Sequence, residues 1–124
     1  MYCSLTKSFS FESAHFLPSF PDDHKCRRLH GHSFQIDVTV SGELPQGSHH
    51  LIDYAEISAA IAPVKDALDH RLLNEIEGLE HPTSERIAEW IWDRLSPVLA
   101  ELSEIVVHET CTSRCAYSGP GRGS

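Results

Sequence analysis

Three histidines and one cysteine have the types and spacing that a metal-dependent reaction needs. His30 and His32 flank one glycine at the start of an alternating apolar run, and Cys26 precedes His30 by four residues. Residues i and i+2 of a strand point to the same side, about 6.6 Å apart, so both imidazoles share the side of Phe34. His15 ends an earlier alternating run with matching parity. If the two strands pair, all three imidazoles can converge on one cation.

The ligand set that these histidines offer is that of catalytic zinc, which usually takes three neutral imidazoles and keeps one position open. A chain with nine histidines can contain one His-x-His pair by chance. The shared parity and the third histidine favour a metal site instead. The main alternative is a structural zinc site closed by a fourth protein ligand, which Cys26, Cys111 or Cys115 would supply.

Cys26 is the candidate for proton transfer or nucleophilic attack. It stands among Lys25, Arg27 and Arg28, next to the predicted metal. Positive neighbours favour the thiolate, which can act as a nucleophile or as a general base. Most free cysteines are small buried apolar residues, but the charged flanks of this one argue against burial.

Asp69 and His70 end the first predicted helix and form a second candidate for acid–base chemistry. An Asp–His pair can hold the histidine in one tautomer and support its imidazolium form. The alternative is that they are ordinary polar residues at a helix C-terminus, where the helix dipole favours a histidine cation.

Glu109 shares a predicted strand face with Ile105 and Val107. A carboxylate with this inward parity costs free energy unless it is paired or hydrogen-bonded, and a heterocycle edge with adjacent N–H donors would satisfy it. The alternative, an acid that reaches solvent at the strand end, stays open. Thr83 and Ser84, at a predicted helix N-terminus, are candidates for further contacts to a ring or an anion.

The elements that must position these residues follow from hydrophobic periodicity. The pattern predicts strands at 4–15, 32–42, 104–112 and 115–119, and helices at 53–70 and 82–102. Pro63 predicts a kink or break in the first helix, and Pro97 should disturb the end of the second. This order predicts an α+β fold, with two helices packed on one face of a four-stranded antiparallel sheet. Such a sheet has two open edges that a multimer can use.

Length and charge restrict the remaining possibilities. The 124 residues predict a single catalytic domain at 1–118, followed by a flexible tail at 119–124. A net charge of −8 argues against nucleic acid as the main partner. No window approaches the roughly 20 apolar residues of a membrane span. The start of the chain is unlike a signal peptide, so we expect reduced cysteines in the cytoplasm.

Several short motifs, taken together and in order, resemble the 6-pyruvoyltetrahydropterin synthase family, in particular its 6-carboxytetrahydropterin synthase branch. The similarity extends from about Phe9 to Tyr117. The Cys-x3-His-Gly-His spacing is similar to the carboxy branch, whereas the pyruvoyl branch typically has a longer gap. The motifs that carry the resemblance are FESAH, HGHSF after the cysteine, IDYAEI, LDHRLLN, PTSE and VVHETCT.

The resemblance implies the tunnelling fold, in which such subunits join edge to edge into barrels. It implies a homo-oligomer, a hexamer or a tetramer, with active sites at the subunit interfaces. It also implies a role for each candidate residue: zinc on His15, His30 and His32, a thiolate at Cys26, an acid–base pair at Asp69 and His70, and a pterin anchor at Glu109.

The activity that the resemblance implies is that of a zinc-dependent lyase in queuosine biosynthesis. Its substrate would be 7,8-dihydroneopterin triphosphate, and its products 6-carboxytetrahydropterin, acetaldehyde and triphosphate. Two alternatives stay open from the sequence. One is a 6-pyruvoyl synthase that eliminates triphosphate from the same substrate. The other is a zinc- or pterin-binding protein without enzymatic activity.

Overall fold

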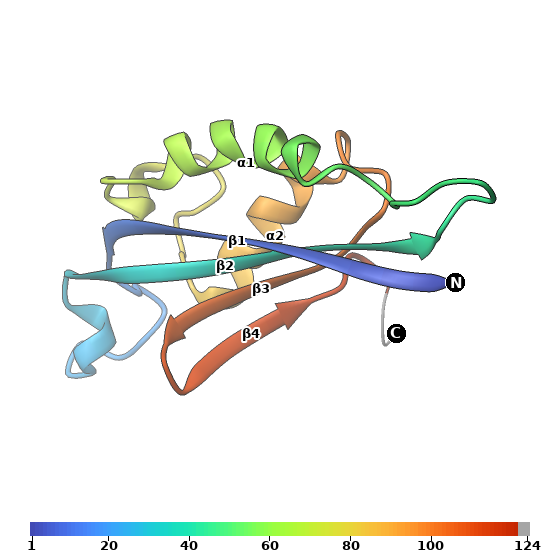
Figure 1. Cartoon of the computed structure of the whole chain (residues 1–124). Coiled ribbons are helices and arrows are strands. Elements are labelled where there is room, and N and C mark those ends of the chain that lie inside the picture. Colours follow the sequence, from blue (N-terminus) through green and yellow to red (C-terminus); the bar gives the residue numbers. More distant parts are fainter. Residues whose placement is uncertain (122–124) are drawn as a thin grey trace.

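The computed structural model describes residues 1–121 and contains one four-stranded antiparallel sheet with two α-helices on one face (Figure 1). The strands lie in chain order across the sheet, β1-β2-β3-β4. The predicted α+β class is confirmed. The elements are β1 (Tyr2–His15), β2 (His30–Glu43), α1 (Tyr54–Leu68), α2 (Ser84–Leu95), β3 (Leu102–Thr110) and β4 (Ser113–Tyr117).

The β1–β2 pair is the longest ladder of the sheet. It runs without interruption from Tyr2 opposite Glu43 to His15 opposite His30. Both strands begin two residues before the predicted ranges, and β2 also ends one residue later, because the ladder continues beyond the apolar alternation. The register places two of the predicted metal ligands directly opposite each other.

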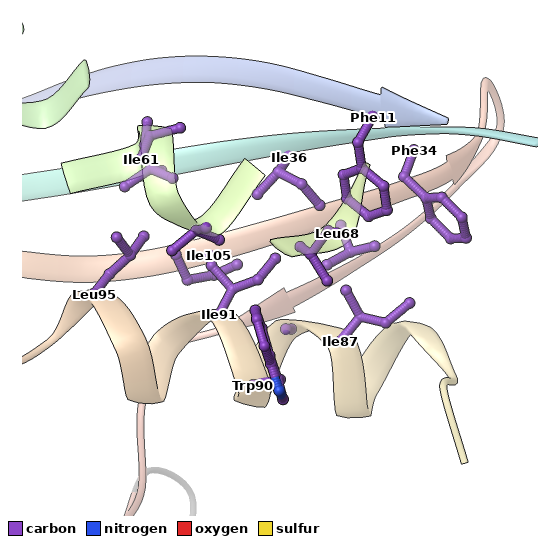
Figure 2. Packing of buried hydrophobic residues seen from close by; sticks show 14 of the residues in the cluster. Phe11, Phe34, Ile36, Ile61, Leu68, Ile87, Trp90, Ile91, Leu95 and Ile105 are labelled. Atoms are coloured by element: carbon purple, nitrogen blue, oxygen red, sulfur yellow. The ribbon is translucent and has the colours of Figure 1, made fainter. Parts of the chain in front are cut away.

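The hydrophobic core lies between the sheet and the two helices (Figure 2). Alternate residues at the end of β1 and in the middle of β2 point to this side and are almost completely buried, as the period of two requires. Trp90 is buried and Trp92 packs against the edge of the core, so both are packing residues. Labelled members of the core in Figure 2 are Phe11, Phe34, Ile36, Ile61, Leu68, Ile87, Ile91, Leu95 and Ile105.

The predicted break at Pro63 is wrong. Helix α1 runs continuously from Tyr54 to Leu68, with Pro63 inside it and exposed to solvent. An interior proline costs about 3 kcal/mol. Four buried side chains of this helix offset that cost, since each contributes about 1.5–3 kcal/mol. They are Ile57, Ile61, Val64 and Leu68.

Helix α2 begins close to the predicted residue, but its predicted extension to residue 102 is wrong, because the helix stops before Pro97 and β3 already begins at Leu102. Thr83 is its N-cap and accepts a hydrogen bond from the backbone N–H of Arg86 at 3.3 Å. The helix ends at Leu95, two residues before Pro97. The cap satisfies one of the backbone N–H groups that the first turn of α2 leaves without a partner in the helix.

A long connection, residues 16–29, joins β1 to β2. It contains a short 3-10 helix, Lys25–Arg27, and the carbonyl of Cys26 accepts a hydrogen bond from the N–H of Leu17 at 2.9 Å. The side-chain amide of Asn74 bonds both the N–H and the carbonyl of Phe16. Figure 1 shows this connection at the same end of the sheet as the C-terminus of α1.

The C-terminal residues that the structure describes pack on α2. Gly119 is buried, and a Cβ atom there would lie 2.4 Å from the Trp92 ring. Residues 122–124 of the predicted tail lie outside the described part of the chain. No helix among the described residues is long and apolar enough to cross a membrane.

Candidate metal centre and active site

The three histidines predicted to converge do so at the end of the β1–β2 ladder. The ring centroid of His15 lies 4.6 Å from that of His30 and 5.0 Å from that of His32, and the latter two are 5.6 Å apart. One donor nitrogen from each ring lies within 4.8 Å of the others. Strand parity and ladder register together produce this cluster.

Backbone carbonyls orient all three rings in the same way. A carbonyl can only accept, so the ring nitrogen beside it carries the proton, and in a neutral imidazole the other nitrogen keeps its lone pair. The Nε2 atoms are therefore free for a metal. The contacts are His15 Nδ1 to Pro82 O (2.9 Å), His30 Nδ1 to Arg28 O (2.8 Å) and His32 Nδ1 to Ser33 O (3.3 Å).

The chemistry of the cluster fits a divalent cation. The Nε2 atoms of His15 and His32 lie 3.1 Å apart, so two lone pairs face each other with no proton between them when both rings are neutral. Tetrahedral zinc with Zn–N bonds of about 2.0–2.1 Å would hold two such nitrogens about 3.3–3.4 Å apart. The separation therefore needs almost no change to accept the ion.

Burial keeps His15 in the form that binds metal. Its side chain is fully buried, and this burial lowers the pKa of His15 below its ordinary value, outweighing the opposite effects of the Pro82 carbonyl and the Glu109 charge. The group of converging donors contains three histidines and no cysteine among the residues described. Within one chain the cluster thus offers three protein ligands, the number typical of catalytic zinc, whereas structural zinc sites usually have four.

Glu109 lies next to the cluster, at the end of β3. Its Oε1 accepts a hydrogen bond from the hydroxyl of Ser84 at 2.9 Å. In the part of the chain that is described, its Oε2 has no hydrogen-bond donor. Pro82, which holds His15, and Ser84, which holds Glu109, are two residues apart at the start of α2. The cap of this helix therefore aligns a metal ligand with a half-buried carboxylate.

Asp69 and His70 form the predicted pair, with 3.1 Å between Asp69 Oδ2 and His70 Nδ1. The other carboxylate oxygen accepts the backbone N–H of Glu12 at 2.9 Å, and this bond is the main cause that lowers the pKa of Asp69. His70 has a positive φ of 56° and its N–H donates to the Glu12 carbonyl. Its side chain is 79% exposed.

Cys26 lies in the 3-10 helix of the connection and is a half-buried free thiol. Its backbone N–H donates to Nδ1 of His24 at 3.0 Å. Within residues 1–121, no contact joins its sulfur to the histidine cluster. The structure brings the histidines together with Glu109 and Ser84, and leaves Cys26 on a neighbouring segment.

Two surface hollows meet at His32. One, of about 590 Å³, is lined by His32, Glu109 and Cys111 among others. The second, of about 460 Å³, is lined by His32, His70 and Arg71 with residues of β1. A ligand at the open metal position can thus extend toward Glu109 on one side and toward His70 on the other.

Sequence reasoning missed three residues that position the site. Pro82 supplies only a carbonyl, which no sequence pattern reveals. The buried Ser13 hydroxyl donates to the Leu68 carbonyl and accepts the N–H of Arg71 at 3.1 Å, holding the turn that carries His70. Asn74 anchors the connection through Phe16, and its place in the motif LDHRLLN was the one available signal.

Comparison with known proteins gives a consistent result. The sequence profile of the family described as 6-pyruvoyl tetrahydropterin synthase matches residues 4–120. A Synechocystis protein named 6-carboxy-5,6,7,8-tetrahydropterin synthase is 45% identical over 120 residues, covering 92% of each chain. A Pyrococcus furiosus protein named dihydroneopterin monophosphate aldolase is 36% identical over 86 residues, covering 69% of this chain and 68% of its own length.

Solved structures give the same fold. The Caenorhabditis elegans 6-pyruvoyl tetrahydropterin synthase superposes with a TM-score of 0.87 at 26% identity, covering 96% of both chains. The sheet, the two helices on one face and the order of the strands are those of the tunnelling fold. Because the family profile covers nearly the whole sequence, the chain belongs to the 6-pyruvoyl tetrahydropterin synthase family.

Proposed function

We propose that this protein is a 6-carboxy-5,6,7,8-tetrahydropterin synthase. It would convert 7,8-dihydroneopterin triphosphate and water to 6-carboxytetrahydropterin, acetaldehyde and triphosphate, a reaction of queuosine biosynthesis. The observation that carries the proposal is the open three-histidine cluster beside Glu109. The relative at 45% identity, which bears this name, supports the choice within the family.

Zinc is the metal that we assign to His15, His30 and His32, because an open set of three imidazole nitrogens is typical of catalytic zinc. A zinc ion bound there would polarise the oxygens of the substrate side chain as a Lewis acid and so acidify the adjacent C–H. The buried, neutral His15 and the carbonyl contacts of the rings make the set ready to bind without rearrangement.

Glu109 and Ser84 are the proposed ring-binding residues. The free oxygen of Glu109 can accept N–H groups from a pterin edge, and a carboxylate accepts two such donors side by side. Ser84 holds the carboxylate in place through its hydroxyl. Thr83 acts indirectly, because its hydroxyl caps α2 and so fixes the position of Ser84.

Cys26 is the proposed general base, and its thiolate would remove the proton from the acidified carbon. His70 is the proposed proton donor on the other side, with Asp69 holding its Nδ1–H and so leaving Nε2 toward the substrate. General acid–base catalysis of this kind contributes roughly 10²–10⁴-fold each. Triphosphate would leave, and water would then cleave the carbon–carbon bond of the side chain, leaving the carboxyl group on the ring and releasing acetaldehyde.

A second copy of the chain would complete this site. The side chain of His70 is mostly exposed, and Cys26 has no contact with the histidine cluster in the described residues of one chain. The outer edges of β1 and β4 can pair with further strands. We therefore propose a homo-oligomer, a hexamer or tetramer, with active sites at its interfaces. All four cysteines are free, which suits the reducing cytoplasm.

Product analysis tests the proposal against its alternatives. Purified zinc-loaded protein is incubated with 7,8-dihydroneopterin triphosphate, and the products are identified by mass spectrometry after aldehyde trapping. We expect acetaldehyde and triphosphate in equal amounts, together with 6-carboxytetrahydropterin. Triphosphate release without acetaldehyde would identify a 6-pyruvoyl synthase instead. A different aldehyde would indicate an aldolase, and an unchanged substrate a pterin-binding protein.

A further inference from the structure

The connection beside the metal centre carries three cations, and the structure divides them into two kinds. Nη1 of Arg27 donates to the carbonyls of Pro18 and Phe20, both at 2.9 Å, and lies 3.3 Å from an Asp22 carboxylate oxygen. The Arg27 guanidinium therefore closes the 18–27 loop on itself. Its charge is already neutralised, and moving it to a ligand would break two hydrogen bonds.

Lys25 and Arg28 differ from Arg27 in this respect. Both side chains are exposed, and within residues 1–121 neither has a hydrogen bond or an ion pair. Asp23 is the remaining acid of the loop without a partner in that part of the chain. Two free cations against one free acid leave a local positive charge in a chain whose net charge is −8.

Arg28 is fixed relative to the metal ligands by its backbone. Its carbonyl accepts the Nδ1–H of His30 at 2.8 Å, and its N–H donates to the Lys25 carbonyl at 3.2 Å. Both residues thus belong to one hydrogen-bonded turn, and its Arg28 carbonyl also orients a metal ligand. Glu109 shares a hollow with His32, whereas Arg28 is joined to His30. A substrate held by Glu109 and the histidines would bring its phosphate chain to this turn if it continues past His30.

We propose that Arg28 and Lys25 bind the phosphate chain of the substrate, and that Arg27 is a structural brace without contact to it. This inference rests on the proposed function, since it names the residues that bind the phosphate end of the substrate proposed there. A guanidinium binds phosphate oxygens through two parallel N–H bonds, and an ammonium adds a compact charge. Together the two side chains would favour binding of a substrate with several phosphates over binding of an unphosphorylated one.

The direct test measures binding of inorganic tripolyphosphate to the zinc-loaded full-length protein by calorimetry. Arg28→Gln and Lys25→Gln each remove one proposed contact, and Arg27→Gln removes the same charge from the neighbouring residue. Zinc content is measured before and after each titration, because tripolyphosphate also chelates zinc. This experiment does not depend on turnover, so it can succeed even if the proposed reaction is wrong.

We expect the dissociation constant to rise about tenfold or more in Arg28→Gln and about threefold or more in Lys25→Gln, which are charge-assisted hydrogen-bond effects. Arg28→Lys should recover part of the loss. Arg27→Gln should lower the melting temperature and change tripolyphosphate affinity less than either. Equal affinity in Arg28→Gln and wild type, or a larger loss in Arg27→Gln than in Arg28→Gln, would overturn the assignment.

Kinetics provides the second readout. With 7,8-dihydroneopterin triphosphate, Arg28→Gln should raise KM about tenfold and leave kcat within about threefold, because the lost contact binds the ground state and the transition state alike. Inhibition by unphosphorylated dihydroneopterin should be unchanged. A loss confined to kcat, or an equal loss of dihydroneopterin affinity, would contradict a phosphate-binding role.

Discussion

Two histidines of the candidate site, His15 and His70, are held in opposite ways. The metal ligand His15 sits on a strand, fully buried, with its Nδ1–H held by a carbonyl. His70 sits on a turn, 79% exposed, in a left-handed backbone conformation. Only the first is held by packing. The second is held by two hydrogen bonds with β1: the His70 N–H donates to the Glu12 carbonyl, and the Glu12 N–H donates to Asp69.

This difference separates metal binding from proton transfer. A metal site needs ligands fixed to within a fraction of an ångström, and a strand ladder provides this at no further cost. A proton donor must reach a substrate that arrives from solvent, so it needs exposure. The contrast predicts that changes at the histidine cluster remove metal and activity together, whereas changes at the turn affect activity with little effect on metal content.

The largest effect is expected from His32→Ala. It leaves two ligands for the ion, so bound zinc should fall from one equivalent to below about one tenth, and turnover should become undetectable. Metal analysis of the purified oligomer measures this directly. His49→Ala, a change of an exposed histidine in the 44–53 loop, is the matched control and should keep full zinc. One full equivalent of zinc in His32→Ala would show that the ligand set is wrong.

Cys26→Ala should reduce kcat by roughly 10²–10⁴-fold, the usual contribution of a positioned general base. Zinc content and oligomeric state should stay those of the wild type, because Cys26 is outside the converging group. Cys111→Ala is the control, since that exposed thiol also lines a hollow at His32. Near-normal turnover in Cys26→Ala would remove the thiol from the mechanism.

The same contrast explains which features the sequence could predict. Side-chain alternation in strands is a local property, so the shared parity of His30 and His32 could be read directly and His15 followed from the pairing of the two strands. The hydrogen bond from Ser84 to Glu109 depends on where α2 packs against β3, which no local pattern encodes. Pattern rules predicted both ends of α1 and the start of α2 closely, but they wrongly broke α1 at Pro63 and extended the second helix to residue 102.

The turn at His70 combines a feature that the sequence could predict with one that it could not. Asp69 and His70 were adjacent in sequence, so their pairing could be expected. Their attachment to β1 through Glu12 could not, because it joins residues more than fifty positions apart. A non-glycine residue with positive φ also follows from this attachment, and not from any preference of histidine for such a conformation.

His70→Gly separates stability from activity at this turn. Glycine adopts a φ of 56° without strain, so the substitution should leave the free energy of unfolding unchanged or raise it by about 1 kcal/mol. Activity should fall roughly 10²-fold or more with the loss of the proton donor. Chemical denaturation measures the free energy of unfolding, and steady-state kinetics measures the activity. Retained activity in His70→Gly would refute the role of the side chain.

The smallest effect concerns the pH dependence of stability. The Glu12 N–H holds the pKa of Asp69 below its ordinary value of 3.8. A carboxylate whose pKa is lowered by folding stabilises the protein above pH 3.8, and this stabilisation is lost as the pH falls through the folded-state pKa. Asp69→Asn should therefore melt at a lower temperature than wild type near pH 6, with the difference shrinking below pH 3.8. A difference that persists unchanged at lower pH would contradict this origin.

X-ray absorption at the zinc K-edge tests most directly whether three imidazoles hold the ion while the thiol stays free. For the zinc-loaded wild-type protein we predict three histidine nitrogens at about 2.0–2.1 Å, one further light atom and no sulfur shell. The spectrum of Cys26→Ala should be the same. A zinc–sulfur distance of about 2.3 Å that disappears in Cys26→Ala would contradict the account, because the proposed base would then be a metal ligand.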